Sequence, residues 1–161
     1  MAELKDLYEM IGFTEVVTYI QSGNVIFKAE DIVPAVHLGK KIEKAINAKY
    51  QFQVPVIIRT PAEIKKVLSS NPFLKEKGID IERLAVTFLH DMPEAADIEQ
   101  VRKFDFPPDR FQINGKEVFL HCPGGFGNTK YSNSFFENKL HTNATTRNWK
   151  TVGKLAELSL I

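Results

Sequence analysis

A chain of 161 residues, 43% of them hydrophobic, can bury one sizeable core or two small ones. The formal net charge is +1, so no global field draws the protein to nucleic acid or to a membrane, and any basic site must be local. The single cysteine, Cys122, excludes an intrachain disulfide, and no apolar run approaches the ~20 residues of a membrane span. We therefore expect a soluble, cytoplasmic protein that has no membrane partner.

The first half of the chain reads as α-β-β-α-β followed by a helix. Apolar residues at helical spacing alternate with runs rich in β-branched and aromatic residues, and a turn over residues 21–24 joins two of these runs. The expected elements are a helix ending at Gly12, strands at 16–20 and 25–28, a helix starting at Asp31 or Pro34, a strand at 54–58 and a helix capped by Thr60.

The second half reads as β-α-β-β-α-β followed by a helix, which is the split βαβ order of ferredoxin-like domains. Its strongest short signal is Asn114-Gly115, a hairpin dipeptide between two β-like runs. The expected elements are a strand at 84–89, a helix at 95–103, strands at 110–113 and 117–120, a helix at 132–140, a strand at 142–146 and a helix at 148–158.

The two halves therefore predict an α+β fold of two ferredoxin-like repeats, 1–72 and 73–161, packed through their trailing helices. The first repeat lacks its N-terminal strand, which is central in this topology, so the strands at 25–28 and 54–58 would keep unpaired backbone groups. Three solutions are open. These strands meet directly, another chain bridges them in a homo-oligomer, or the true protein starts upstream of Met1.

Two motifs, Thr18–Val25 and Ala144–Trp149, resemble the bacterial "domain of unknown function 1697" family. Gly125-Phe126-Gly127 with Lys130, and Glu137-Lys139-Leu140, are similar to its glycine-loop and helix signature. The resemblance implies a pair of ferredoxin-like domains and no established activity. Family members usually begin with a strand and a glycine-containing loop that have no counterpart here, in agreement with the missing strand.

The leading candidate site is the basic stretch around the only tryptophan. Arg147 and Lys150 share a face at a helix start, Asn148 can cap that helix, and Trp149 beside a guanidinium can stack on a ring or a base. The alternative is a solvated basic face with Trp149 packed between the two domains.

Two further sets of side chains are candidates for ligand contact. Gln21, Ser22 and Asn24 place polar groups at one hairpin tip, where Gln21 and Ser22 are not required by any turn type. Lys130 follows a glycine-rich loop, although the spacing there fits neither a phosphate loop nor a dinucleotide fingerprint. A flexible loop before a helix therefore explains this stretch better than a nucleotide cradle does, and Lys130 stays a candidate for contact with an anion.

Cofactor and metal patterns are not found, so we expect neither a cofactor nor a metal. The four histidines are scattered without ligand spacing. Cys122 follows His121 on a strand, and neighbours on a strand point to opposite faces, so this pair indicates a buried thiol rather than a nucleophile and its base.

The sequence favours a small binding module for an anionic ligand, either a phosphate-bearing small molecule or a single-stranded nucleic acid. One alternative is an enzyme with a site between the two repeats that uses Arg147 to hold an oxyanion, in a pocket flanked by Arg147 and Tyr131. Another is a structural or interaction protein that completes its sheet with a partner.

Overall fold

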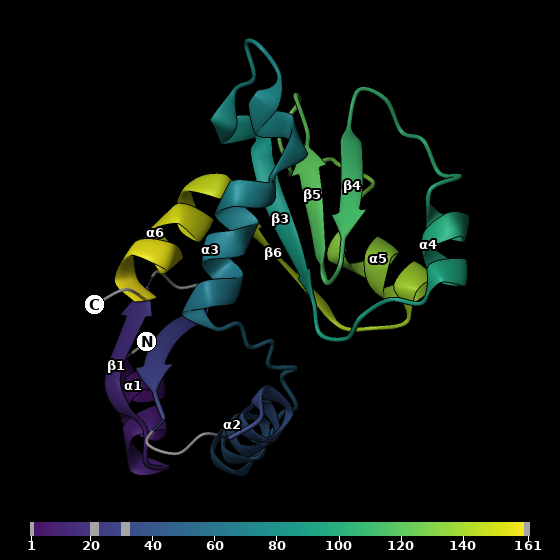
Figure 1. Cartoon of the computed structure of the whole chain (residues 1–161). Coiled ribbons are helices and arrows are strands. Elements are labelled where there is room, and N and C mark those ends of the chain that lie inside the picture. Colours follow the sequence, from purple (N-terminus) through teal and green to yellow (C-terminus); the bar gives the residue numbers. More distant parts are fainter. Residues whose placement is uncertain (1, 20–22, 30–32, 160–161) are drawn as a thin grey trace. The chain divides into compact units, whose positions relative to one another are not determined.

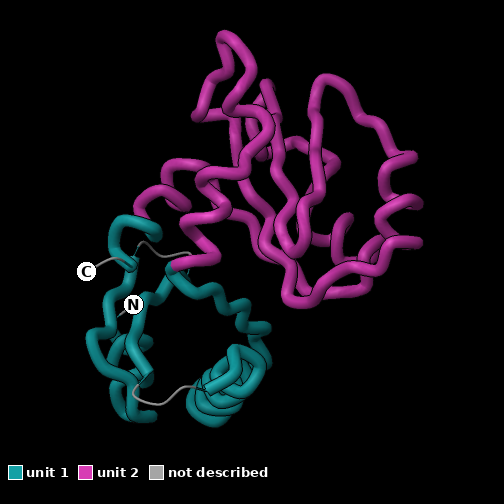
Figure 2. The backbone as a smooth tube through the Cα atoms, viewed as in Figure 1, with its two compact units in different colours: residues 1–61, 155–161 teal, residues 62–154 magenta. Residues whose placement is uncertain are grey.

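The structure is a computed structural model that describes all residues except 1, 20–22, 30–32, 160 and 161. The described residues form helices and strands, and the strands belong to two separate sheets, which confirms the α+β class (Figure 1). The chain forms two compact units (Figure 2). Unit 1 comprises Met1–Pro61 with Leu155–Ile161, and unit 2 comprises Ala62–Lys154. The expected boundary between the two repeats, after residue 72, differs from the boundary between the two compact units, because α3 (Pro61–Ser70) lies almost wholly in unit 2. The repeats stay a prediction.

The described residues of unit 1 form two helices and one hairpin before the boundary at Pro61. Its elements are α1 (Ala2–Met10), β1 (Thr14–Tyr19), β2 (Asn24–Lys28) and α2 (Ala35–Tyr50). The β1–β2 pairing is antiparallel, with Val17 opposite Ile26, as the hairpin pattern predicts. Pro34 precedes α2 directly, so of the two expected starts the proline is the correct one.

The strand expected at 54–58 is a wrong prediction. Residues 53–60 form neither helix nor strand and run as an extended trace from α2 to the next helix (Figure 1). The alternation of apolar residues is real, but a strand also needs a neighbour for its ladder, and the described residues provide none for this segment. The amide of Val56 instead donates to Glu43 Oε1 at 2.8 Å.

The core of unit 1 lies between the hairpin and the two helices. Leu7, Tyr8 and Phe13 are buried beside Ile42 and Ile46 of α2. The apolar residues at i, i+3 and i+4 on each helix place these side chains on one face, as the sequence pattern requires.

Unit 2 contains the larger sheet and most of the remaining helices. Its elements are α3 (Pro61–Ser70), the 3₁₀ turns η1 (Pro72–Lys75) and η2 (Ile81–Arg83), β3 (Leu84–Leu89), α4 (Ala95–Val101), β4 (Arg110–Asn114), β5 (Glu117–His121), α5 (Asn133–Leu140) and β6 (Ala144–Asn148). The last helix, α6 (Trp149–Ser159), begins in unit 2, and its residues from Leu155 on belong to unit 1. No helix among the described residues is long and apolar enough to cross a lipid bilayer.

The four strands of unit 2 have the order β4-β5-β3-β6, all antiparallel, as expected for a split βαβ unit. β3 is central and all six of its residues are buried. The β4–β5 hairpin is confirmed, but its two-residue loop is Gly115-Lys116 rather than Asn114-Gly115. Gly115 has φ 62°, so glycine supplies the positive φ at the first loop position.

One face of this sheet carries the core of unit 2. Ala85 and Leu89 of β3 pack with Val101 of α4 and Phe136 and Leu140 of α5. Because side chains alternate along a strand, Val86 and Phe88 face the other way.

Candidate functional site

The basic stretch selected from the sequence lies at the junction between β6 and α6. Arg147 is half-buried on β6, and its Nη1 donates to Thr145 Oγ1 at 2.7 Å and to the Thr146 carbonyl at 2.9 Å. Burial lowers the pKa of the guanidinium, although an arginine stays charged in proteins. The contacts with residues 145 and 146 hold this side chain along its own strand.

The neighbours of Arg147 lie at the start of α6. Asn148 Oδ1 accepts a hydrogen bond from Thr151 N at 2.8 Å, which is the N-cap contact expected from the sequence. Lys150 is exposed and lies 3.3 Å from Glu82 Oε1, an exposed pair of the kind that contributes little stability. Trp149 is partly exposed.

Arg147 and Tyr131 do not flank a common pocket in unit 2. Arg147 is opposite Val86 in the β3–β6 register, so it lies on the face away from the α4–α5 core. Tyr131 is buried in that core, and its hydroxyl accepts from Phe106 N at 3.0 Å and donates to the Phe104 carbonyl at 3.2 Å. The pocket expected for the enzyme alternative is therefore not formed by these two residues.

The hairpin tip is described only in part. Gln21 and Ser22 lie outside the described residues. Asn24 starts β2 in unit 1, is buried, and donates from Nδ2 to the Tyr19 carbonyl at 3.2 Å. This contact closes the hairpin, so the Asn24 amide has a structural role whatever else it does.

Lys130 belongs to a surface cluster of aromatic and basic side chains that the sequence analysis does not predict. Its ammonium lies 5.2 Å from the centroid of the Phe106 ring, and the ammonium of Lys139 lies 4.4 Å from that of Phe104. Phe135 contacts both rings, at centroid distances of 5.5 and 5.9 Å. We call these five residues the Phe–Lys patch.

The Phe–Lys patch forms because two segments of unit 2 meet over one face of the sheet. Phe104 and Phe106 lie in the loop after α4, whereas Phe135 and Lys139 are one helical turn apart on α5. Ser132 caps α5 by accepting from Phe135 N at 3.2 Å. The three rings are partly buried, and the Lys130 side chain is exposed. Two signals in the sequence point toward the Phe–Lys patch: the i, i+4 spacing of Phe135 and Lys139, and the Phe-x-Phe sequence of Phe104 and Phe106.

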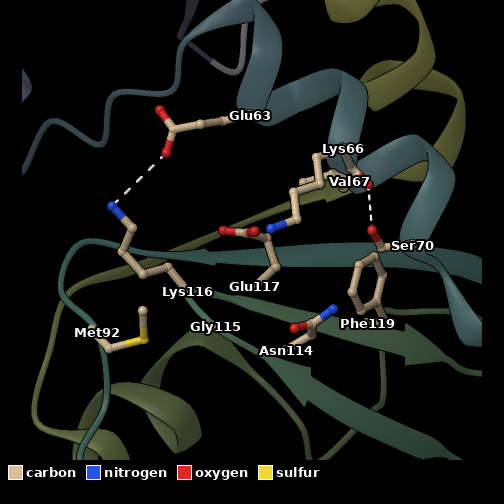
Figure 3. A pocket seen from close by; sticks show the side chains of 10 residues that line it. All are labelled: Glu63, Lys66, Val67, Ser70, Met92, Asn114, Gly115, Lys116, Glu117 and Phe119. Carbon is tan, nitrogen blue, oxygen red and sulfur yellow. Dashed lines mark hydrogen bonds and ion pairs between the residues drawn. The ribbon is translucent and has the colours of Figure 1, made fainter.

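A second feature of unit 2 is a pocket of about 190 Å³ between α3 and the β4–β5 hairpin (Figure 3). Its charged lining is mixed, because Lys66 and Lys116 face Glu63 and Glu117, and Lys116 lies 4.0 Å from Glu63. Ligand pockets usually measure about 300–1,000 Å³, so this one is small. Its balanced charge gives no preference for an anion.

Arg110 is another basic group, and it is held by the structure. Its guanidinium makes a bidentate contact with Glu76 at 2.7 and 2.8 Å and lies 4.8 Å from the Phe73 ring centroid. The hydrogen bonds from Arg110 lower the pKa of Glu76, and burial followed by the Arg110 charge lowers the pKa of His121. This cluster ties η1 to the sheet.

Cys122 is fully buried in the α4–α5 core, as its sequence context predicts. Burial raises the pKa of its thiol, and Sγ lies 3.6 Å from Thr129 Oγ1. Its neighbour His121 contacts Arg110, on the other face of the sheet. A thiol in this environment is protonated and shielded from solvent, so it is no candidate nucleophile.

The described residues place the chain in a structural class. It is an α+β protein with a complete split βαβ sheet, a two-stranded sheet and an aromatic, basic surface patch. The chain belongs to the family described as "Protein of unknown function (DUF1697)", which matches residues 1–119. This confirms the family that the sequence resembles, and the motif Thr18–Val25 lies within the matched residues. None of the curated proteins matches the chain.

A solved structure supports the fold. The conserved bacterial protein SP0830 from Streptococcus pneumoniae is similar over 100% of this chain and 89% of that chain, with a TM-score of 0.73 and 20% sequence identity. At this identity the likeness shows the fold alone. Any function must be argued from the side chains of this chain.

Proposed function

We propose that this protein is a small binding module for single-stranded nucleic acid, and that the Phe–Lys patch is its contact surface. The observation that carries the proposal is the position of two ammonium groups over aromatic rings. Neither Lys130 nor Lys139 has a carboxylate partner among the described residues, so both charges can meet a phosphate. Lysine and aromatic side chains together are the usual means of holding a single strand.

The patch suits a strand better than a small phosphate compound. Three rings in mutual contact offer stacking area to successive bases, which is sequence-tolerant because every base has a π-face. A small ligand is usually enclosed in a pocket, and the pocket of Figure 3 is built from other residues. A net charge of +1 is consistent with a local basic site.

The test is fluorescence anisotropy with a labelled 12-residue oligo-dT, measured over a series of salt concentrations. Replacing both lysines, Lys130→Gln with Lys139→Gln, should weaken binding and reduce the salt slope by about 1.4, since each single-strand phosphate contact contributes about 0.7. The matched control removes two exposed charges elsewhere in unit 2, Lys65→Gln with Lys77→Gln, and should change the affinity much less.

Two further samples identify the ligand class and the surface. Phe104→Leu keeps an apolar side chain but removes a ring, so it should weaken oligonucleotide binding and leave any binding of inorganic phosphate unchanged. Arg147→Ala tests the β6–α6 junction as a second surface. Equal affinities for the lysine double variant and its control would reject the Phe–Lys patch as the binding surface. Binding of adenosine monophosphate without binding of the oligonucleotide would show that the ligand is a small molecule and not a nucleic-acid strand.

A further inference from the structure

The pocket between α3 and the β4–β5 hairpin lies on the face of the four-stranded sheet that is turned away from the α4–α5 core. Val118 and Leu120 of β5 pack in that core, so Glu117 and Phe119, which alternate with them along the strand, face α3 (Figure 3). Two rings of the Phe–Lys patch pack against the α4–α5 core. The pocket is therefore separate from the surface proposed for nucleic acid, and a ligand of the pocket does not depend on that function.

The inner wall of the pocket is apolar, and its rim carries an exposed apolar side chain. Val67 of α3 and Phe119 of β5 line the inner wall and are buried. Met92, which follows β3, also lines the pocket, but its side chain is 64% exposed. A methionine side chain is flexible and adapts to apolar groups of different shape. The rim therefore offers a contact to an aliphatic group of a ligand.

Four charged side chains surround this apolar surface, and each element contributes one of each sign. α3 contributes Glu63 and Lys66. The β4–β5 hairpin contributes Lys116 and Glu117. In Figure 3 the charged ends of Lys116 and Glu63 point toward each other, and those of the other two side chains do the same. The charges of the lining therefore cancel.

The ion pair across the pocket is long. The Lys116 ammonium lies 4.0 Å from Glu63 Oε2, which is beyond hydrogen-bond distance. The two side chains are 33% and 40% exposed, so solvent weakens their attraction. Charge-assisted hydrogen bonds are shorter, at about 2.7–2.9 Å, and stronger. A ligand that carries both an ammonium and a carboxylate can make such bonds to these side chains.

The mixed signs of the lining disfavour a ligand that carries one charge only. A phosphate that meets a lysine of the pocket also meets a carboxylate, and a simple cation meets an ammonium in the same way. A zwitterion, which has both charges, avoids this repulsion. The volume of about 190 Å³ lies below the usual range of about 300–1,000 Å³, so the pocket suits a single amino acid better than a nucleotide.

We propose that this pocket binds a free α-amino acid with an aliphatic side chain, such as leucine. The carboxylate of the amino acid accepts a hydrogen bond from the Lys116 ammonium, and its own ammonium donates to the Glu117 carboxylate. The aliphatic side chain lies against Met92. Lys66 and Glu63 add a second charge of each sign from α3.

Isothermal titration calorimetry of the full chain with L-leucine and two analogues tests this assignment. Leucinamide keeps the ammonium and lacks the carboxylate, whereas N-acetyl-leucine keeps the carboxylate and lacks the ammonium. Each analogue should bind about tenfold or more weakly than leucine, because each loses charge-assisted hydrogen bonds. Glycine should also bind more weakly, because it leaves Met92 uncovered, and Met92→Ser should reduce the preference for leucine over glycine.

Two variants separate the roles of the two charges. Lys116→Gln should weaken the binding of leucine and N-acetyl-leucine by about tenfold and leave the affinity for leucinamide unchanged. Glu117→Gln should weaken the binding of leucine and leucinamide and leave the affinity for N-acetyl-leucine unchanged. The matched control, Lys65→Gln, changes an exposed residue of α3 outside the pocket lining and should alter none of the three. A purely structural role of Lys116 or Glu117 would weaken all three ligands alike.

Three results for the parent chain would overturn the proposal. One is a Kd for leucine weaker than about 1 mM, because a ligand of this size that makes the proposed contacts should reach that affinity. Another is equal affinity for leucine and its two analogues, which would show apolar adhesion alone. The third is tighter binding of leucinamide or inorganic phosphate than of leucine, which would make the ligand an ion of a single charge.

Discussion

Asn148 illustrates how one contact assigns a residue that the sequence leaves ambiguous. Its amide can cap a helix or bind a ligand, and both readings fit the residue type. The hydrogen bond from Thr151 N assigns the Asn148 oxygen to the helix. Lys150 lies beside Glu82 in an exposed ion pair, which contributes little stability. One of the four side chains proposed at this junction, Asn148, therefore has a structural role in unit 2.

Tyr8 makes the stability of unit 1 depend on pH in the alkaline range. Burial raises the pKa of its phenol from 10.0 to about 12. The folded state thus holds the proton more tightly than the unfolded state does, so the stabilisation is present below pH 10 and is lost as the pH rises from 10 to 12. The free energy of unfolding should fall by roughly 2–3 kcal/mol across that window through this group.

Urea titrations at pH 9, 10, 11 and 12 measure this loss, with Tyr8→Phe as the control for lysines that titrate in the same range. The parent should lose more stability than the variant as the pH rises. Parallel curves for the two proteins would show that Tyr8 ionises equally easily in both states.

The patch residues show where sequence reading ends. The place of Lys130 after a glycine-rich loop indicates a candidate site, but the sequence alone does not predict that Phe104, Phe106 and Phe135 meet, because the rings come together only after α5 packs against the loop that follows α4. Contacts between residues about 30 positions apart leave no periodic trace in the sequence. Arg147 and Trp149, which are close in the chain, were found for the opposite reason.

At the scale of elements, local patterns predicted most helices and strands correctly. Hairpins are encoded by neighbouring residues, so β1–β2 and β4–β5 were found, with an error of one position at Gly115. The segment 54–58 was misread because its alternation is a local property, whereas a ladder requires a partner strand. β6 begins two residues later than expected and ends where Asn148 caps α6.

Gly39 offers a test of how α2 packs on the segment 54–58. It lies buried inside α2, where glycine costs about 0.5–1 kcal/mol relative to alanine. A Cβ there would meet the Val56 carbonyl oxygen at 3.6 Å and Ile58 Cδ1 at 3.9 Å, which are ordinary contact distances. Gly39→Ala should therefore stabilise the protein by about 0.5–1 kcal/mol.

Chemical denaturation of the parent and of two variants at Gly39 checks this. Gly39→Leu is the matched control, because its additional atoms must displace Ile58 and should destabilise the protein by about 1–3 kcal/mol. A loss of stability in Gly39→Ala would mean that α2 and the segment lie closer together than the structure shows.

At the scale of the whole molecule, the two units differ in how completely their backbones are paired. β3 is paired along both edges and buried on both faces, β2 is paired along one edge, and the segment 53–60 belongs to no sheet. A two-stranded hairpin is only marginally stable by itself, so unit 1 depends on packing against α1 and α2.

Native-state amide exchange should rank the segments in the same order. We expect β3 to exchange slowest, β2 faster, and the segment 54–58 fastest, with the extremes separated by roughly a hundredfold or more, because opening free energies range from near zero up to that of global unfolding. Among these three segments, low concentrations of urea should speed exchange mainly at β3, since its amides require extensive unfolding to open. Equal protection of the three segments would mean that the backbone of unit 1 is as fully paired as that of unit 2.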